Sequence, residues 1–234
     1  MRAILRFLKD PFTWAVLAFC VIVLAVFGTH FWNATNHSRS VTAEPPTVHI
    51  HPLRPDDHIT GNPNGSIRLF LYMDTECPYC KDLQRGNIPR LIAKYGKIFK
   101  IIYRDFPIPI HPPAFREEEA VECAYQQKGD DGYFKFIAMV YHETTSKNEF
   151  PEIRLHQIAR EIGLNGDTFD ECYAKEATKA RVQRDLDDAQ SAGFEVTPSV
   201  VIEGGGKSYL VEGNYYSRIA AAVDAILHST TLVQ

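Results

Sequence analysis

The pattern of apolar and polar residues in the middle of the chain predicts a strand, a helix and a second strand in succession. Ile67–Met73 is a mostly apolar run with aromatic residues, which is typical of a buried strand. The polar segment Asp74–Glu76 ends this run, and helical spacing follows from about Pro78 to Tyr95. A strand is expected again over Ile98–Arg104. Together these elements predict a βαβ unit.

The second half of the chain predicts a series of helices and then a ββα unit. Strands are expected over Ser199–Ile202 and Ser208–Val211, with Gly204–Gly206 as the hairpin turn between them, followed by a helix over Tyr215–Leu227. The expected fold class is α/β, a small sheet with helices on both faces and a helical insertion at about 112–193. The segments with helical spacing are Ala114–Gln127, Tyr133–Tyr141, Glu152–Ile162, Asp167–Ala174 and Thr178–Ala192.

The N-terminal region carries an uncharged apolar run over residues 12–32, which is long enough to span a membrane. Arg2, Arg6 and Lys9 precede the run, and this charge indicates an N-terminus on the cytoplasmic side. A cleavable signal peptide is the alternative, but its apolar core is usually shorter, and no clear cleavage site follows Gly28. We therefore expect a single-pass anchor in the inner (cytoplasmic) membrane, with the C-terminal domain in the periplasm or outside the cell.

The chain is expected to have three parts. Residues 1–34 hold the cytoplasmic N-terminus and the anchor, residues 35–57 form an extended tether, and residues 58–234 form one folded domain. The tether is rich in proline and has little apolar periodicity. His49, His51 and His58 lack a clear metal-ligand pattern, and we expect neither a metal nor a cofactor. The net charge of −4 gives no electrostatic case for nucleic-acid binding.

The motif Cys77-Pro78-Tyr79-Cys80 stands where the predicted strand turns into the predicted helix. Proline suits the first position of a helix, so Cys77 lies at the helix N-terminus, where unpaired N–H groups and the helix dipole stabilise a thiolate. Cys80 follows one turn later on the same face, within disulfide reach. This arrangement predicts a redox pair in which Cys77 is the exposed nucleophile and Cys80 resolves the mixed disulfide.

Other interpretations of the cysteines are weaker. A structural zinc site would need two more ligands at comparable spacing, and the chain has no second Cys-x-x-Cys. A structural disulfide across two residues would close a very small loop and add little stability. Of the five cysteines, Cys20 lies in the predicted anchor. We expect Cys123 and Cys172 to form a structural disulfide in the insertion, with two buried free thiols as the alternative.

Further motifs, taken with the cysteine pair, make the chain resemble the DsbA-type thiol–disulfide oxidoreductases, in particular their membrane-tethered bacterial branch. The resemblance covers nearly everything from Asp56 to the C-terminus and implies a thioredoxin-like fold with an inserted helical domain. The motifs are Asp56–Gly65, Tyr72–Cys80, Tyr103–Pro107, His111-Pro112, Cys123-Ala124-x-x-Gln127 and Val196–Ser199.

The resemblance also implies roles for particular residues and partners. Pro198 is expected to be a cis-proline that faces the cysteine pair, and Thr197 is expected to offer its backbone to an extended substrate segment. Pro78 and Tyr79 would support the active site from within the motif. A quinone-linked membrane oxidase is the electron acceptor that the resemblance implies.

The sequence departs from the wider thioredoxin pattern in one place. Many thioredoxin-fold enzymes have a buried acid six positions before the reactive cysteine, and here that position is Leu71. Asp74 and Glu76 lie closer to the turn and are expected to be solvated, so a proton-relay role for either is doubtful. Glu76 is expected to oppose formation of the Cys77 thiolate by like-charge repulsion.

The sequence thus predicts an extracytoplasmic thiol–disulfide oxidoreductase that donates disulfides through Cys77–Cys80 to folding secreted or envelope proteins. A reductase or isomerase is an alternative, because a threonine before the proline leaves the direction of electron flow open. The short, irregular tether, however, offers no dimerisation domain of the kind that isomerases of this fold use. A non-catalytic tethered chaperone or assembly factor of the same fold is the other alternative.

Overall fold

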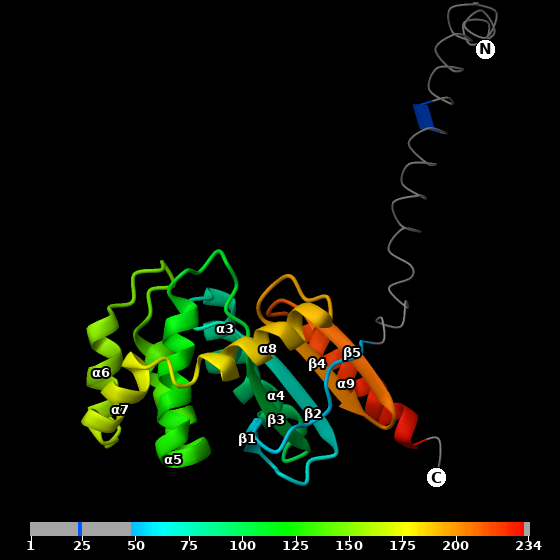
Figure 1. Ribbon diagram of the computed structural model, residues 1–234. Helices are drawn as coiled ribbons and strands as arrows, with labels where there is room; N and C mark the ends of the chain where they lie inside the picture. The colour runs from blue at the N-terminus through cyan, green and yellow to red at the C-terminus, as the bar shows by residue number, and fades with distance from the viewer. Residues whose placement is uncertain (1–22, 25–47, 232–234) are drawn as a thin grey trace, which may run out of the picture. The chain divides into compact units, whose positions relative to one another are not determined.

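The computed structural model describes Val23–Leu24 and residues 48–231 of the chain (Figure 1). The chain separates into two units, Met1–Glu44 and Pro45–Gln234. Among the described residues, no helix is both long enough and apolar enough to cross a membrane. The anchor predicted over residues 12–32 lies outside the described residues, apart from Val23 and Leu24.

A five-stranded sheet in the order β1-β3-β2-β4-β5 forms the centre of the second unit. Strands β2 and β3 run parallel, with Ile67 opposite Phe99, and every other neighbouring pair is antiparallel. The four predicted strands are confirmed, whereas the short first strand is one that the sequence pattern did not predict. The strands are β1 (His58–Gly61), β2 (Ile67–Met73), β3 (Phe99–Asp105), β4 (Ser199–Gly204) and β5 (Lys207–Glu212).

Helices connect and cover the strands (Figure 1). The helix predicted after the cysteine motif forms in three continuous pieces, α3 (Pro78–Asp82), the π-helical turn η1 (Leu83–Asn87) and α4 (Ile88–Tyr95). The first two predicted insertion helices follow each other within α5 (Ala114–Glu143) and are separated by a kink at Gly129, whose φ of 58° and ψ of −149° are not helical. The remaining helices are α6 (Glu152–Glu161), α7 (Gly166–Ala174), α8 (Lys179–Ser191) and α9 (Tyr216–Thr231).

Two apolar cores lie on the two faces of the sheet. Successive residues of β2 point to opposite faces, so Leu69 and Leu71 enter one core, whereas Phe70 and Tyr72 enter the other. The first core is closed by α4, α9 and the insertion, and it includes both cysteines of the motif. The second core is closed by α8 and by Phe194. The active-site end of β2 is therefore packed from both faces.

Residues 48–57, which were expected to end the tether, belong to the folded domain. Arg104 is fully buried, and its guanidinium donates to the carbonyls of His51 and Pro52, at 3.0 Å each. It also pairs with Asp57 at 2.8 Å and with Asp188 at 2.7 Å. Because these partners lie far apart in sequence, the pattern of the segment alone could not reveal the packing. The apolar residues of the segment that pack on the second core are Val48, Ile50 and Leu53.

His58, to which the sequence pattern assigned no role, is a buried residue of β1. Its ring stacks on Tyr133 with 3.7 Å between centroids, and its Nε2 lies 2.7 Å from Glu122 Oε1. Burial lowers the pKa of His58, but Asp130, 3.7 Å from Nδ1, and the hydrogen-bonded Glu122 outweigh burial and raise it to about 9. His58 therefore serves as a paired cation that ties β1 to α5.

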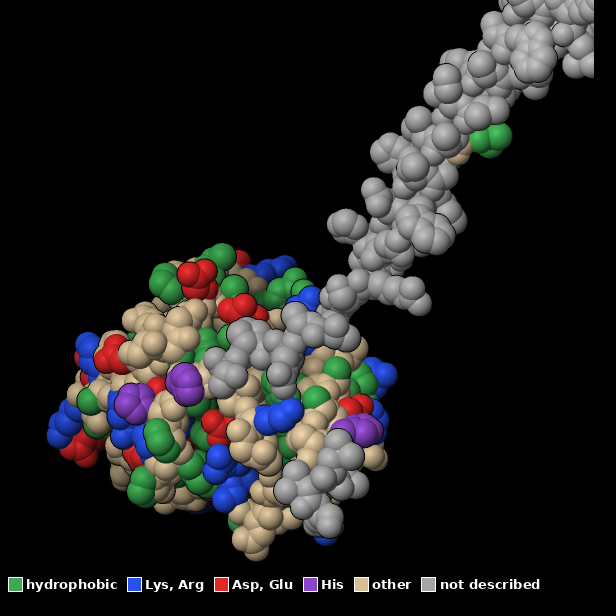
Figure 2. Space-filling model, turned by 90° about the vertical axis from the view of Figure 1, so that its right-hand side faces the viewer, with side chains coloured by type: hydrophobic (Ala, Val, Ile, Leu, Met, Phe, Trp, Pro, Cys, Tyr) green, Lys and Arg blue, Asp and Glu red, His purple; other side chains and the backbone are tan. Residues whose placement is uncertain are grey.

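The two cysteines of the insertion are joined by a disulfide, with 6.0 Å between the Cα atoms of Cys123 and Cys172. The bridge links α5 to α7 and lies beside the first core. On the face drawn in Figure 2, acidic and basic side chains are interspersed, and neither sign of charge forms a broad patch.

Candidate active site

Cys77 stands at the point where β2 gives way to helix α3. Its backbone is extended, with φ −73° and ψ 120°, and Pro78 occupies the first helical turn. The Cys77 carbonyl accepts the amides of Cys80 and Lys81, at 3.1 Å each. The structure thus places Cys77 at the N-terminus of the helix and Cys80 one turn into it, as the spacing predicted.

Both thiols are free in the structure, and both are buried. Cys80 has no exposed surface, and Cys77 retains only 2% of its accessible surface, so the prediction of an exposed nucleophile is wrong. Cys77 Sγ lies 3.3 Å from the carbonyl oxygen of Thr197, a residue 120 positions away. The covering loop could not be deduced from the motif itself. Tyr79, between the two cysteines, is 62% exposed.

The two sulfurs differ in their acidity. A hydrogen bond from Cys80, with a further contribution from Thr197, lowers the pKa of Cys77 to about 6 against the opposing effect of burial. Burial raises the pKa of Cys80 well above its ordinary value, and the neighbouring Cys77 and Asp74 add to this effect. At neutral pH Cys77 is therefore a thiolate, whereas Cys80 is a thiol that can donate to it. Such an asymmetry assigns nucleophilic character to Cys77.

The loop before β4 forms the other wall of the site. The Thr197–Pro198 peptide bond is cis, and the Thr197 carbonyl faces Cys77 Sγ. The Pro198 carbonyl accepts the amide of Gly213 at 2.7 Å, and the Ser199 hydroxyl donates to the Val196 carbonyl at 2.8 Å. These bonds fix the shape of the loop and join it to the end of β5.

Glu76 is fully buried, so the expectation of a solvated carboxylate is wrong. Its carboxylate accepts the hydroxyl of Thr144 at 3.1 Å, the amide of Asn148 at 3.1 Å and the amide of Phe150 at 3.3 Å. A buried carboxylate is tolerated when several donors satisfy it. Because these donors belong to the loop after α5, no local sequence signal identified them. The Glu76 carboxylate is therefore bound by that loop.

Asp74 is also fully buried rather than solvated, and it contacts both cysteines. Its carboxylate accepts the Cys77 amide at 3.1 Å, and its own amide donates to Cys80 Sγ at 3.4 Å. The second carboxylate oxygen accepts the amide of Ile108 at 2.9 Å and lies 3.0 Å from His111 Nδ1. The carboxylate that opposes the Cys77 thiolate is Asp74 rather than the expected Glu76, because its charge raises the pKa of Cys77. His111 had been identified only as part of a motif, without a role in the site.

Two more buried acids stand at the start of α5. Glu117 and Glu118 are 2% and 1% exposed, and none of their four carboxyl oxygens has a hydrogen-bond partner among the described residues. Burial raises the pKa of Glu117 to about 8, so Glu117 is neutral at pH 7, and burial also raises the pKa of Glu118 well above its ordinary value. A run of three glutamates is usually a solvated helix face, which is why the sequence pattern did not point to them.

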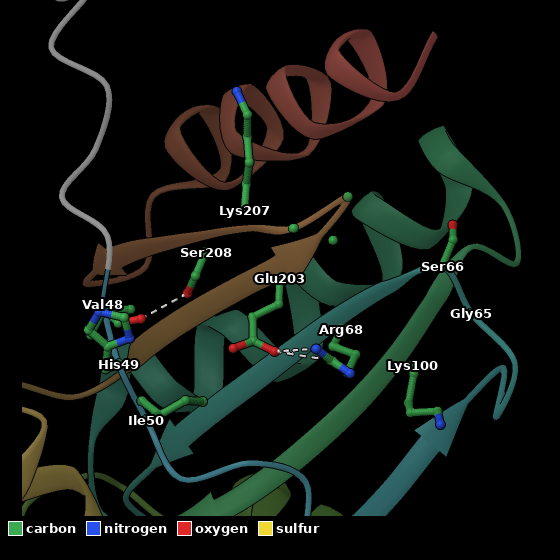
Figure 3. A pocket seen from close by; sticks show the side chains of 13 residues that line it. Val48, His49, Ile50, Gly65, Ser66, Arg68, Lys100, Glu203, Lys207 and Ser208 are labelled. Atoms are coloured by element: carbon green, nitrogen blue, oxygen red, sulfur yellow. Dashed lines mark hydrogen bonds and ion pairs between the residues drawn. The ribbon is translucent and has the colours of Figure 1, made fainter. Parts of the chain in front are cut away.

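A separate pocket of about 560 Å³ lies at the other end of the sheet, where β2 begins and β4 turns into β5 (Figure 3). Arg68 and Glu203 form an ion pair across it at 2.8 Å, and Ser208 donates to the Val48 carbonyl at 3.1 Å. No cysteine lines this pocket. Within the part of the chain that the structure describes, no group of three or more metal-ligating side chains is arranged to hold an ion.

The described domain is similar to proteins of one fold. A family model described as thioredoxin matches residues 54–224. The oxidised BdbD structure from Bacillus subtilis has a TM-score of 0.68 and 16% identity, covering 78% of this chain and 98% of that one. Alpha-DsbA1 from Wolbachia pipientis has a TM-score of 0.64 and 22% identity, covering 77% of this chain and 95% of that one. A thioredoxin-like oxidoreductase from Silicibacter pomeroyi DSS-3 has a TM-score of 0.60 and 27% identity, covering 74% of this chain and 92% of that one.

Curated sequence relatives are longer proteins. The Na(+)/H(+) antiporter NhaA from Herminiimonas arsenicoxydans is 30% identical over 209 residues, which cover 87% of this chain and 32% of that protein. NhaA 1 from Mycolicibacterium gilvum is 28% identical over 159 residues, which cover 66% of this chain and 25% of that protein. The chain thus spans between a quarter and a third of the length of these relatives, and antiport is a property of those longer proteins.

Proposed function

This chain belongs to the thioredoxin family and has a DsbA-type fold, and we propose that it is a thiol–disulfide oxidoreductase, in particular a dithiol oxidase outside the cytoplasm. The observation that carries the proposal is the acidity of Cys77, whose pKa is lowered to about 6 chiefly by a hydrogen bond from Cys80. A stabilised thiolate stabilises the reduced enzyme, and a stable reduced form makes the disulfide form a strong oxidant. The preferred direction is therefore transfer of a disulfide to a client protein.

Transfer begins with the Cys77–Cys80 disulfide. A client thiolate attacks Cys77 Sγ, forms a bond to it and breaks the bond between the two enzyme sulfurs. Cys80 leaves as a thiolate and takes up a proton, because burial keeps its pKa high. A second client thiolate then attacks the client sulfur of the mixed disulfide and releases Cys77 as a thiolate. Two electrons have moved from the client to the enzyme, and the client has gained a disulfide.

The wall opposite the cysteines is suited to hold the client. An extended client segment can pair with the backbone of Thr197, whose carbonyl is 3.3 Å from Cys77 Sγ, as an added strand. Three large apolar side chains remain exposed on the segments that build the site, and they can contact apolar residues of an unfolded client. They are Tyr79, Ile110 and Val196. Because Cys77 is covered, binding must widen the gap between the Pro198 loop and α3.

We place this activity at the outer side of the inner membrane, with residues 12–32 as the anchor. The support is the apolar run itself and the Cys123–Cys172 disulfide, which is typical of oxidising compartments. A quinone-linked membrane oxidase, which the resemblance to the DsbA family implies, would take the electrons from reduced Cys77 and Cys80. Anchoring both proteins in one membrane would keep them close together.

The proposal is tested by mixing the oxidised full chain with a reduced model peptide that holds two cysteines. The chain should carry Cys20→Ser, so that only the extracytoplasmic cysteines take part. We expect one peptide disulfide to form for each enzyme disulfide lost, and no transfer from the Cys77→Ser control. A chain that leaves the peptide reduced, with Cys77 alkylated only near the free-cysteine pKa of roughly 8.5, would instead be a chaperone or assembly factor of this fold.

A further inference from the structure

The carboxylate of Asp74 places a negative charge beside the sulfur that must become a thiolate. It is fully buried and accepts the Cys77 amide at 3.1 Å, and its charge raises the pKa of both Cys77 and Cys80. An uncompensated buried carboxylate at this position would work against the low pKa of Cys77. The site therefore needs a positive charge on the far side of Asp74.

His111 is the basic side chain that meets this carboxylate. Its Nδ1 lies 3.0 Å from Asp74 Oδ2, and within the described residues it is the only base in an ion pair with Asp74. The same carboxylate oxygen accepts the amide of Ile108 at 2.9 Å, and the His111 amide donates to the Ile108 carbonyl at 2.9 Å. The loop after β3 is thus fixed so that the imidazole faces Asp74.

Three acidic groups act on His111. Its pKa is raised first by the contact with Asp74, against the effect of burial, and further by the charges of Cys77 and Glu76. Glu117, which approaches the same turn from α5, is neutral at pH 7 because burial raises its pKa to about 8. His111 thus contacts the Asp74 carboxylate, Glu76 adds a second negative charge in its surroundings, and a third appears when Cys77 is a thiolate.

We propose that His111 is the counter-cation of this active site: it compensates the charge of Asp74 and thereby stabilises the reduced, thiolate form of the Cys77–Cys80 pair. It is a positioning residue, because its imidazole contacts Asp74 and acts on the sulfur through that charge. The proposal rests on Cys77 being the attacking sulfur, as proposed above, but not on the direction of electron flow. It locates a determinant of the reduction potential outside the Cys-x-x-Cys motif.

The first test compares His111→Gln with the parent full chain, both carrying Cys20→Ser, by following thiolate absorbance of Cys77 against pH. We expect the acid dissociation constant of Cys77 to fall about tenfold, because an opposite charge near the site is lost. The equilibrium constant with glutathione should change about tenfold in favour of the disulfide, which corresponds to a potential about 30 mV more negative. His142→Gln, at the exposed end of α5, is the matched control and should change neither value.

A double-mutant cycle separates charge compensation from a structural role. Asp74→Asn should remove the need for the cation, so His111→Gln in that background should shift the Cys77 acid constant less than about twofold. A tenfold shift in both backgrounds would show that His111 acts without Asp74 and would overturn the proposal. A His111→Gln protein that is folded but has an unchanged Cys77 acid constant would overturn it as well.

A measurement on the unaltered side chain covers the case in which the variants fail to fold. The His111 imidazole can be titrated by NMR in the oxidised and in the reduced protein. We expect its proton affinity to be about threefold higher or more in the reduced protein, since only that form carries the Cys77 charge. Equal titration in both forms would overturn the proposal. The parent potential alone decides whether the chain is an oxidase, so either conclusion can fail without the other.

Discussion

Removing the disulfide of the insertion should lower stability without abolishing the chemistry. The bond joins α5 to α7 across a sequence separation of 49 residues. In the chain-entropy model a crosslink of that span restricts the unfolded chain by about 4 kcal/mol. For a domain of this size, 1 kcal/mol corresponds to about 2–4 °C in Tm, so the Cys123→Ala/Cys172→Ala variant should melt about 8–16 °C lower.

The assay is thermal unfolding followed by circular dichroism, with the Cys20→Ser chain as the reference. Cys123 is fully buried, so alanine also removes apolar contacts at this position. The Cys123→Val/Cys172→Val variant restores apolar volume without a crosslink and should melt close to the alanine variant. Below its Tm, the alanine variant should oxidise the model peptide at the parent rate, because the Cys77 site makes no bond to the bridge.

Two results would refute this reasoning. A melting temperature within about 2 °C of the reference would show that the crosslink adds no net stability, contrary to the loop-entropy estimate. A folded variant that no longer oxidises the peptide would show that the bridge takes part in the chemistry or in shaping the Cys77 site.

Cys80→Ser should accumulate mixed disulfides with client proteins in cells, seen on non-reducing gels, whereas Cys77→Ser should accumulate few; equal accumulation would refute Cys77 as the nucleophile. Folding raises the pKa of Glu117 from 4.5 to about 8, so stability is lost as pH rises between these values. Glu117→Gln should therefore leave the free energy of unfolding in urea unchanged at about pH 4 and raise it by up to about 3 kcal/mol at about pH 7. Equal effects at both pH values would contradict the raised pKa of Glu117. Glu76→Gln should lower the free energy of unfolding by about 1–3 kcal/mol in the same assay, because a neutral amide has one acceptor oxygen for the donors of the 144–150 loop. An unchanged stability would show that these donors do not depend on the Glu76 carboxylate.

The sequence predicted those parts of the fold that depend on local pattern. The apolar run of β2, the helical spacing after it and the glycine turn before β5 are each encoded within a few neighbouring residues. The sequence pattern did not predict the short strand β1, because His58–Gly61 contains only one large apolar residue. The strand forms because its backbone pairs with β3. The packing of residues 48–57 likewise depends on Arg104, which is distant in sequence.

The same division applies to the site. The cysteine pair and its helix N-terminus could be predicted, because strand, turn and helix are contiguous. The burial of Cys77 depends on the Thr197 carbonyl, and the burial of Glu76 depends on amides beyond α5, so neither is encoded near the motif. His111 was noticed only as part of a motif, because its function depends on a carboxylate on another loop.

The measurement that tests the central claim most directly is the reduction potential of the Cys77–Cys80 pair. The full chain, carrying Cys20→Ser, would be equilibrated with glutathione buffers and the fraction of disulfide counted by thiol alkylation. With the pKa of Cys77 lowered to about 6 and that of Cys80 raised, we expect a potential clearly more oxidising than that of thioredoxin, shifted in the direction of DsbA at roughly −120 mV. A value close to that of thioredoxin, roughly −270 mV, would contradict the oxidase assignment and identify a reductase.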